Sequence, residues 1–248
     1  MPTEPKITHL AALRALISRQ APGQTALPLC PLGLPALDAA LEGGLPRGCL
    51  QEVIPGDEGA TAAGFTAFLL GRLVKEGADT GRGVLWASLG EGDLYPPALA
   101  GYGLDPGEVI LLSAPSPAEL LWAMEEALRS PALAGVVGEV DRLDLTAGRR
   151  LQLAAAAGGG VGFLLLRADR PAAAVSAAAL RWRVRAGPDR AWPNRTWPNR
   201  TWHVELLRRR GGRPGKWILE REDETDRLLV ASELGDGSAA PQARLSGG

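Results

Sequence analysis

Residues 43–64 read Gly-Gly-Leu-Pro-Arg-Gly-Cys-Leu-Gln-Glu-Val-Ile-Pro-Gly-Asp-Glu-Gly-Ala-Thr-Ala-Ala-Gly. A short apolar run over residues 50–54 leads into a glycine-containing turn, and a helical run follows over residues 61–75. A strand, such a turn and a helix in this order form the frame of a phosphate-binding loop, whose signature is G-x-x-x-x-G-K-[ST]. The stretch therefore predicts a strand–turn–helix unit of the nucleotide-binding type.

The residues that bind a nucleotide are missing from this turn. Thr61 stands at the position of the lysine in the signature, and Ala62 stands at the position of the hydroxyl that holds magnesium. Such a loop holds phosphate through backbone N–H groups, a helix N-terminus and the lysine charge. Here the turn instead adds two carboxylates, so we predict a protein without a nucleotide or metal cofactor and without ATPase activity. The degenerate loop consists of Gly56, Asp57, Glu58, Gly59 and Thr61.

No other catalytic pattern takes the place of this loop. The chain has no G-x-S-x-G nucleophile elbow, and its two histidines, His9 and His203, lie far apart in the sequence. Cys30 and Cys49 lack the spacing of metal ligands, and we interpret them as free buried thiols. The sequence therefore predicts a protein that acts by binding and not by catalysis.

Composition and charge set the class of protein. The chain has 248 residues, 46% of them hydrophobic, and a formal net charge of −1, which gives no overall attraction to nucleic acid or membrane. The start of the chain lacks the apolar stretch of a signal peptide. The longest weakly polar run, residues 154–166, is too short to cross a bilayer. We therefore expect a cytoplasmic protein that does not contact membranes.

Predicted strands and helices alternate from Cys49 onward, which indicates an α/β fold. The strands are nearly continuous apolar runs, as in a mostly parallel sheet with helices on both faces. They cover residues 50–54, 84–89, 109–113, 135–140 and 162–166. Helices or helical turns are predicted between them at residues 61–75, 95–102, 117–129 and 146–157. This alternation predicts an open sheet with right-handed crossovers.

The pattern changes in the last third of the chain, where apolar and polar residues alternate. Residues 181–185, 202–207 and 216–221 have this pattern, which predicts antiparallel strands added to the sheet. The small polar residues at the end predict a disordered tail. We divide the chain into residues 1–31 (an N-terminal helix and linker), 32–234 (the main domain, with the antiparallel extension from about residue 172) and 235–248 (the tail).

The N-terminal segment, residues 6–20, has the spacing of an amphipathic helix. A linker rich in proline and glycine follows it, so the apolar face of this helix has to be buried elsewhere. It packs either on the core of its own chain or on a neighbouring protein, including a second copy. The residues of this face are Ile7, Leu10, Leu13, Leu16 and Ile17.

A local excess of arginine, interleaved with tryptophan, marks the antiparallel region. Residues 192–196 and 197–201 are a tandem Trp-Pro-Asn-Arg-Thr repeat, whose prolines predict an exposed loop. Arginines bind phosphates and exposed aromatic rings stack on bases, so weak contact with single-stranded DNA is one interpretation. In the other, Trp182, Trp202 and Trp217 pack in the core and the arginines are only solvated. The candidate contacts are Arg181, Arg183, Arg185, Arg195, Arg200, Arg208, Arg209, Arg210, Arg213 and Lys216.

Several short segments resemble known families. Residues 32–41 and 43–48 resemble the segment that precedes the phosphate loop in RecA-family recombinases. A further series is similar to the ImuA family in its order and spacing, and the resemblance extends over residues 30–222. The tandem repeat departs from the pattern of the family. The series comprises residues 93–99, 103–106, 137–140, 142–146, 149–154, 204–208 with Trp202, and 210–215.

The resemblance implies a RecA-like fold with an N-terminal helical arm, and a part in SOS-induced mutagenesis. ImuA proteins are accessory partners of a Y-family-polymerase-like protein and an error-prone replicative-type polymerase, which together copy damaged DNA. The chain is accordingly expected to be a non-catalytic adaptor that joins the nucleoid when active, with RecA as a further partner. By the spacing of the resemblance, the acid that holds the metal in a RecA-like enzyme falls near Gly138 or Glu139, of which Glu139 is the only carboxylate. A single-stranded DNA-binding RecA-like protein and a SulA-like cell-division inhibitor remain as alternatives.

Overall fold

The computed structural model describes residues 28–57, 60–76, 82–90, 92, 94–167, 175–187, 201–221 and 228–233. Several predictions made from the sequence lie outside these residues. They concern the N-terminal helix with Ile7, Leu10, Leu13, Leu16 and Ile17, the loop residues Glu58 and Gly59, the repeat with Arg195 and Arg200, and the tail. Within the described part, no helix combines the length and the apolar character needed to cross a membrane.

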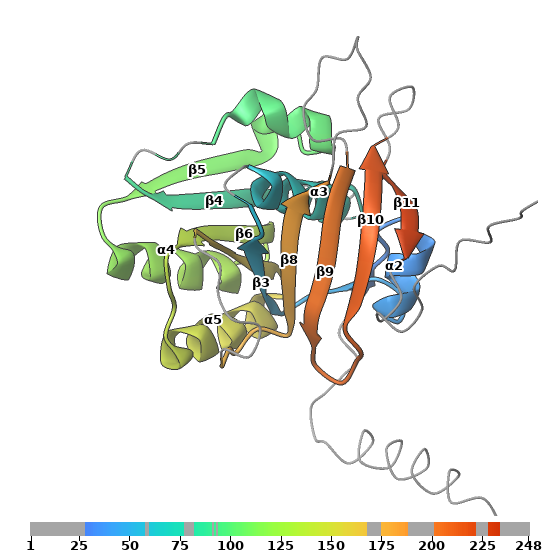
Figure 1. Ribbon diagram of the computed structural model, residues 1–248. Helices are drawn as coiled ribbons and strands as arrows, with labels where there is room; N and C mark the ends of the chain where they lie inside the picture. The colour runs from blue at the N-terminus through green and yellow to red at the C-terminus, as the bar shows by residue number, and fades with distance from the viewer. Residues whose placement is uncertain are drawn as a thin grey trace, which may run out of the picture.

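A nine-stranded sheet forms the centre of the described structure (Figure 1). Its order is β11-β10-β9-β8-β3-β7-β6-β4-β5, with parallel pairing from β8 to β5 and antiparallel pairing from β8 to β11. The prediction of an α/β fold with a mostly parallel sheet is therefore confirmed. The strands are β3 (Leu50–Pro55), β4 (Gly83–Leu89), β5 (Val109–Ala114), β6 (Leu133–Val140), β7 (Val161–Leu166), β8 (Leu180–Ala186), β9 (Thr201–Arg209), β10 (Gly215–Arg221) and β11 (Leu228–Glu233).

Helices cover both faces of the parallel strands, as the continuous apolar runs predict. Helix α3 (Thr61–Glu76) packs on one face, and α4 (Pro117–Arg129) and α5 (Leu145–Gly158) lie together on the other (Figure 1). Strand β3 shows why both faces are apolar, since successive side chains of a strand point to opposite faces. Its Val53 joins the core under α3, whereas Leu50 and Ile54 join the core under α4 and α5.

Shorter elements precede β3 and follow β4. Strands β1 (Leu29–Cys30) and β2 (Leu45–Pro46) form a small antiparallel pair, with α2 (Pro35–Ala40) between them in the chain. The 3₁₀ helices η2 (Pro96–Tyr102) and η3 (Pro106–Glu108) connect β4 to β5. Cys30 and Cys49 are buried free thiols, as predicted, and burial raises the pKa of Cys49 to about 12.

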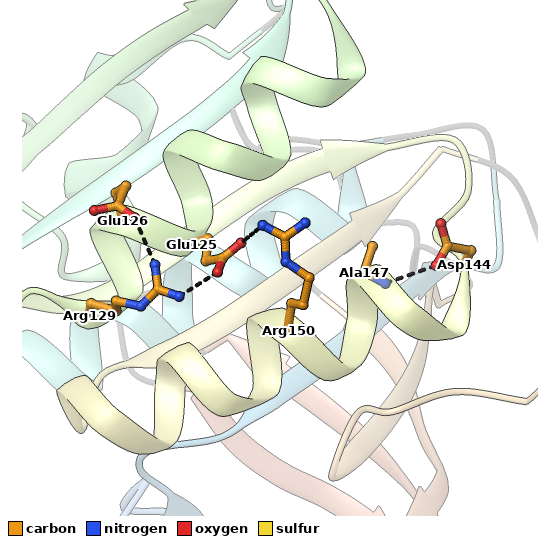
Figure 2. Close-up of polar contacts among 6 residues, drawn as sticks. All are labelled: Glu125, Glu126, Arg129, Asp144, Ala147 and Arg150. Carbon is orange, nitrogen blue, oxygen red and sulfur yellow. Dashed lines mark hydrogen bonds and ion pairs between the residues drawn. The ribbon is translucent and has the colours of Figure 1, made fainter.

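Helices α4 and α5 begin at N-capping residues, and α5 also ends at a C-capping glycine. The hydroxyl of Ser116 accepts a hydrogen bond from the Glu119 N–H. The carboxylate of Asp144 accepts one from the Ala147 N–H (Figure 2). Both are N-caps, which satisfy backbone donors that the first turn of a helix leaves unpaired. At its other end α5 stops at Gly159, whose φ of +76° favours glycine.

An ion-pair cluster joins α4 to α5 (Figure 2). The Glu125 carboxylate accepts hydrogen bonds from Arg129, on its own helix, and from Arg150 of α5. Arg129 also donates to Glu126 at 2.7 Å. Burial acts to raise the pKa of Glu125, but the hydrogen bonds from the two arginines outweigh it and lower the pKa below its ordinary value.

The C-terminal region differs from the prediction in two respects, the direction of β8 and the presence of β11, which was not predicted. Strand β8 was expected to be antiparallel like the strands after it, but it pairs in parallel with β3, from Gln51 opposite Leu180 to Pro55 opposite Val184. The antiparallel extension therefore begins between β8 and β9. Strands β7 and β8 flank β3 on opposite sides and both pair with it in parallel, and parallel strands are joined by crossover connections and not by hairpins.

The tryptophans of β8, β9 and β10 belong to the core. Trp182, Trp202 and Trp217 are all buried, which confirms the core interpretation for these three rings. Phe65 of α3 meets Trp182 edge-on at 5.5 Å between ring centroids, and Trp202 edge-on at 6.0 Å. Through these contacts α3 holds the antiparallel extension against the parallel part of the sheet.

Candidate functional site

A crevice opens at the carboxyl ends of β3, β6 and β7. In open α/β sheets, ligands bind outside the carboxyl ends of the strands, at the point where the strand order reverses. Here the connections from two adjacent strands lead to opposite sides: β4, which follows β3 in the chain, lies beyond β7 and β6, and β8, which follows β7, lies on the other flank of β3. The cavity measures about 610 Å³, and its lining includes Asp57, Glu139 and Arg167.

The turn after β3 is bound tightly to the end of β8. The Gly56 N–H donates to the carbonyl of Val184 at 2.7 Å. A Cβ at Gly56 would lie 2.9 Å from the Cβ of Arg185, so this close approach requires glycine. The carboxylate of Asp57 accepts a hydrogen bond from the Ala186 N–H and another from the hydroxyl of Thr61 at 3.3 Å. The predicted loop residues therefore anchor the turn to a neighbouring strand.

This arrangement places negative charge where a phosphate loop holds an anion. Thr61, at the lysine position, is buried and donates its hydroxyl to Asp57, and it supplies no charge. At an effective dielectric constant of about 20, two like unit charges about 4 Å apart repel by about 4 kcal/mol. A phosphate beside the ionised Asp57 would meet repulsion of this order. The turn is therefore suited to a neutral or cationic group.

The acid that the resemblance aligns with a metal-holding residue has a different set of partners. Glu139, near the end of β6, accepts a hydrogen bond from Trp86 Nε1 at 2.7 Å, and its other carboxylate oxygen lies 3.5 Å from the Arg167 guanidinium. No cluster of three or more His, Cys, Asp or Glu side chains with the geometry of a metal site occurs among the described residues. The sequence did not predict this triad, because Trp86 lies within β4, Glu139 near the end of β6 and Arg167 directly after β7.

The candidate DNA contacts do not form one surface. Arg181 is 1% exposed, and its Nε donates to the Glu52 carboxylate at 2.7 Å. Glu52 also accepts a hydrogen bond from Ser176. The prediction of Arg181 as a DNA contact is therefore wrong. The alternating pattern placed Arg181 on one face of the strand but could not show what covers that face. Ser176 and Ala178, which precede β8, lie on it.

Arg209 also has a structural role in place of the predicted surface role. Its guanidinium donates to the carbonyls of Ala40 at 3.0 Å and Leu41 at 3.2 Å, at the end of α2. It also pairs with Glu42 at 2.8 Å, and this hydrogen bond lowers the pKa of the Glu42 carboxyl. Unpaired carbonyls at a helix end need such donors. Arg209 therefore ties β9 to α2.

The remaining candidates differ in their surroundings. Arg183 and Lys216 flank Glu205, at 4.0 and 3.5 Å, so part of the predicted basic excess is neutralised within the sheet. Arg208 is exposed and donates to the Ser176 carbonyl at 2.9 Å. Three further predicted contacts are exposed: Arg185 near the end of β8, and Arg210 and Arg213 at the turn between β9 and β10.

Comparison with known proteins identifies relatives of this chain. No family model matches it. It is similar to Protein ImuA of Caulobacter vibrioides strain NA1000 / CB15N, with 36% identity over 214 residues, which cover 81% of this chain and 86% of the relative. Protein ImuA of Caulobacter vibrioides strain ATCC 19089 / CB 15 matches with the same identity and coverage. At this identity over most of both proteins, the chain belongs to the ImuA family.

Proposed function

We propose that the chain is a non-catalytic accessory protein of an SOS-induced, error-prone translesion DNA synthesis complex, and that it works through contacts with other proteins. Membership of the ImuA family supports the link to DNA damage and mutagenesis. The observation that carries the non-catalytic part is the turn after β3, where Asp57 accepts hydrogen bonds from Ala186 and Thr61 in the place where a phosphate loop binds its anion.

The proposed partners follow from the resemblance. They are a Y-family-polymerase-like protein and an error-prone replicative-type polymerase, with RecA as a further candidate. We infer in addition that the fold is RecA-like, since a parallel sheet with helices on both faces carries the degenerate loop directly after β3. A degenerate loop on such a sheet suits a protein that kept the architecture of a nucleotide-binding enzyme and lost its chemistry.

The test combines nucleotide binding with capture of a purified partner. Calorimetry of the full chain with magnesium and ATP should give no binding heat, and no phosphate should be released over that of a buffer blank. The Y-family-like protein from the same genome should be retained by the immobilised chain. Tight uptake or steady hydrolysis of ATP would refute the non-catalytic part, and failure to retain the purified partner would refute the adaptor part.

Weak contact with single-stranded DNA is a second candidate, favoured by the exposed cations at the β9–β10 turn. Replacing Arg208, Arg210 and Arg213 together by serine should weaken DNA binding and flatten its dependence on salt, since each lost phosphate contact lowers the salt slope by about 0.7 for single strands. The matched control is Arg142→Ser, which removes an exposed cation after β6. Equal salt slopes for the triple variant and the control would eliminate this role for the turn.

A further inference from the structure

Strand β5 forms one edge of the sheet and has the composition of a strand that is paired on both sides. It pairs with β4 from Val109 to Ala114, and within the described part of the chain no strand pairs with its outer side. An edge strand presents a row of unpaired N–H and C=O groups, with which another chain can pair. We propose that two copies of this protein pair through β5, antiparallel and about a two-fold axis, so that their sheets become continuous.

The two edges of the sheet, which lie at its opposite ends, differ in how they are protected (Figure 1). Charged residues, prolines, bulges and covering elements are the features that prevent edge strands from pairing. The six residues of β5 include no charge and no proline, and their register with β4 is continuous. At the other edge, the pairing of β11 with β10 has a register shift between Ile218 and Leu219, and α2 contacts β11. Pairing with another chain is therefore expected at β5 and not at β11.

The side chains of β5 favour an apolar neighbour on both faces of the sheet. Val109 and Leu112 pack against the two cores, one on each face. Between them, Ile110 is 58% exposed and Leu111 is 52% exposed. Successive side chains of a strand point to opposite faces, so these two lie on different faces. A strand added beside β5 would cover both, and each Å² of apolar surface that it buries contributes about 25 cal/mol.

A second copy of β5 is complementary to the first. A two-fold axis perpendicular to the sheet makes the two strands antiparallel and brings equal faces of the two sheets together. With the axis at the middle of the strand, Leu111 lies beside Leu111 of the second copy, and Ile110 lies beside Leu112. Apolar pairs of this kind across an antiparallel ladder stabilise a sheet. The exposed side chains of the strand are therefore matched by its own sequence.

Charge favours the antiparallel arrangement over the parallel one. Glu108, directly before β5, is exposed. Parallel pairing would place the two Glu108 carboxylates side by side, and like charges directly opposite each other are destabilising. Antiparallel pairing places each beside Ala114 of the other copy, so the two carboxylates lie about 20 Å apart along the strands, beyond the screening length of about 8 Å. Because β11 is protected, association through β5 stops at the dimer.

Analytical ultracentrifugation of the full chain over a range of concentrations tests the dimer. It should show a reversible dimer of twice the chain mass of 26.0 kDa. Leu111→Lys should weaken the dimer at least about tenfold, since it removes two leucines from the contact and places like charges at the axis. Leu153→Lys makes the same change at a leucine of α5 that is 70% exposed. This control should leave the dissociation constant within about twofold of the original.

Mixing two variants tests whether the occupant of the edge is a second copy. Leu111→Glu alone should weaken the dimer as Leu111→Lys does. A mixture of the two should form a dimer more tightly than either variant alone, because opposite charges then meet at the axis. Thermal unfolding shows which variants are folded. Ile110→Lys, on the other face of the strand, takes the place of Leu111→Lys if the latter does not fold.

Several outcomes would overturn the dimer through β5. They are a chain that stays monomeric at all concentrations, a dimer that persists in folded Leu111→Lys or Ile110→Lys, a mixture that associates no better than its components, and growth into assemblies larger than a dimer. The dimer goes beyond the proposed function and does not depend on it. A monomeric chain that retains the purified Y-family-like protein would eliminate the dimer and leave the adaptor role standing.

Discussion

The ion pair between Glu52 and Arg181 joins β3 to β8. The two residues are direct neighbours in the parallel register, and both side chains are buried. Taking two charges out of water is costly, and their attraction compensates for the cost only when geometry and further hydrogen bonds are good. Ser176 supplies such a hydrogen bond to Glu52. The pair therefore joins β3 to β8 in the buried part of the sheet.

Removing one member of this pair should be strongly destabilising. We expect Arg181→Met to lower the free energy of unfolding by about 3–5 kcal/mol, because it leaves the Glu52 carboxylate buried without its counter-ion. The double variant Glu52→Leu with Arg181→Met should lose less than the single variant. Urea unfolding monitored by circular dichroism measures both. A single variant that unfolds at the original urea concentration would contradict the structural role of Arg181.

His203 provides a test of pH dependence. Burial, and then the positive charge of Arg185 opposite it in the sheet, lower the pKa of His203, while Glu205 acts in the other direction. The unfolded chain therefore binds a proton at higher pH than the folded chain, so the stability associated with this group falls as the pH drops below about 6.5. Between about pH 7 and pH 5, His203→Gln should lose less stability than the original protein in parallel urea titrations. Identical losses of stability in the two proteins would show that the pKa of His203 is not lowered in the folded state.

At the scale of elements, α3 depends on two glycines to lie against η2. A Cβ at Gly71 would come within 2.6 Å of the Tyr102 carbonyl oxygen, which is backbone. A Cβ at Gly64 would come within 2.8 Å of the Tyr102 hydroxyl, which is the end of a side chain. Glycine inside a helix normally costs about 1 kcal/mol relative to alanine. Its presence here is explained by the close approach of the two elements.

The two glycines should respond differently to substitution. Gly71→Ala should destabilise the protein by about 1–3 kcal/mol, since the backbone of η2 would have to move. Gly64→Ala should cost less, because the Tyr102 side chain can rotate away and the helix gains in propensity. Thermal unfolding of the two variants in parallel provides the comparison. Stabilisation by Gly71→Ala would mean that η2 does not pack on α3 as described.

At the scale of the whole molecule, Arg209 connects the antiparallel extension to the N-terminal part of the described structure. α2 has six residues, too few to be stable alone, so its position depends on tertiary contacts. Arg209→Ala removes the hydrogen bonds to Ala40 and Leu41, and we expect a loss of about 1–3 kcal/mol. Hydrogen exchange should rise in residues 34–44 more than in β3. Arg210→Ala replaces an exposed neighbour and is the control. It should leave the free energy of unfolding and the hydrogen exchange of residues 34–44 nearly unchanged.

Much of the architecture was predictable because its signals are local. The apolar runs of β3 to β7 are continuous since both faces of these strands are covered, and the predicted helix over residues 117–129 agrees with α4. Ser116 and Asp144 mark helix starts by the hydrogen bonds that their side chains make within one turn. The degenerate turn after β3 was equally visible, because its chemistry depends on which residues occupy consecutive positions.

The order of the elements from β3 to β10, their apolar faces and the absence of a lysine at position 61 could be predicted from the sequence, since each depends on residues within about one helical turn or strand. The elements β1, α2, β2 and β11 were not predicted. The direction of β8, the burial of Arg181, the capping role of Arg209 and the contacts of Glu139 with Trp86 and Arg167 became visible in the three-dimensional structure alone. The physical reason is that burial and ion pairing depend on which distant segments come together. Periodicity assigns a side chain to a face of its element but carries no information about what covers that face.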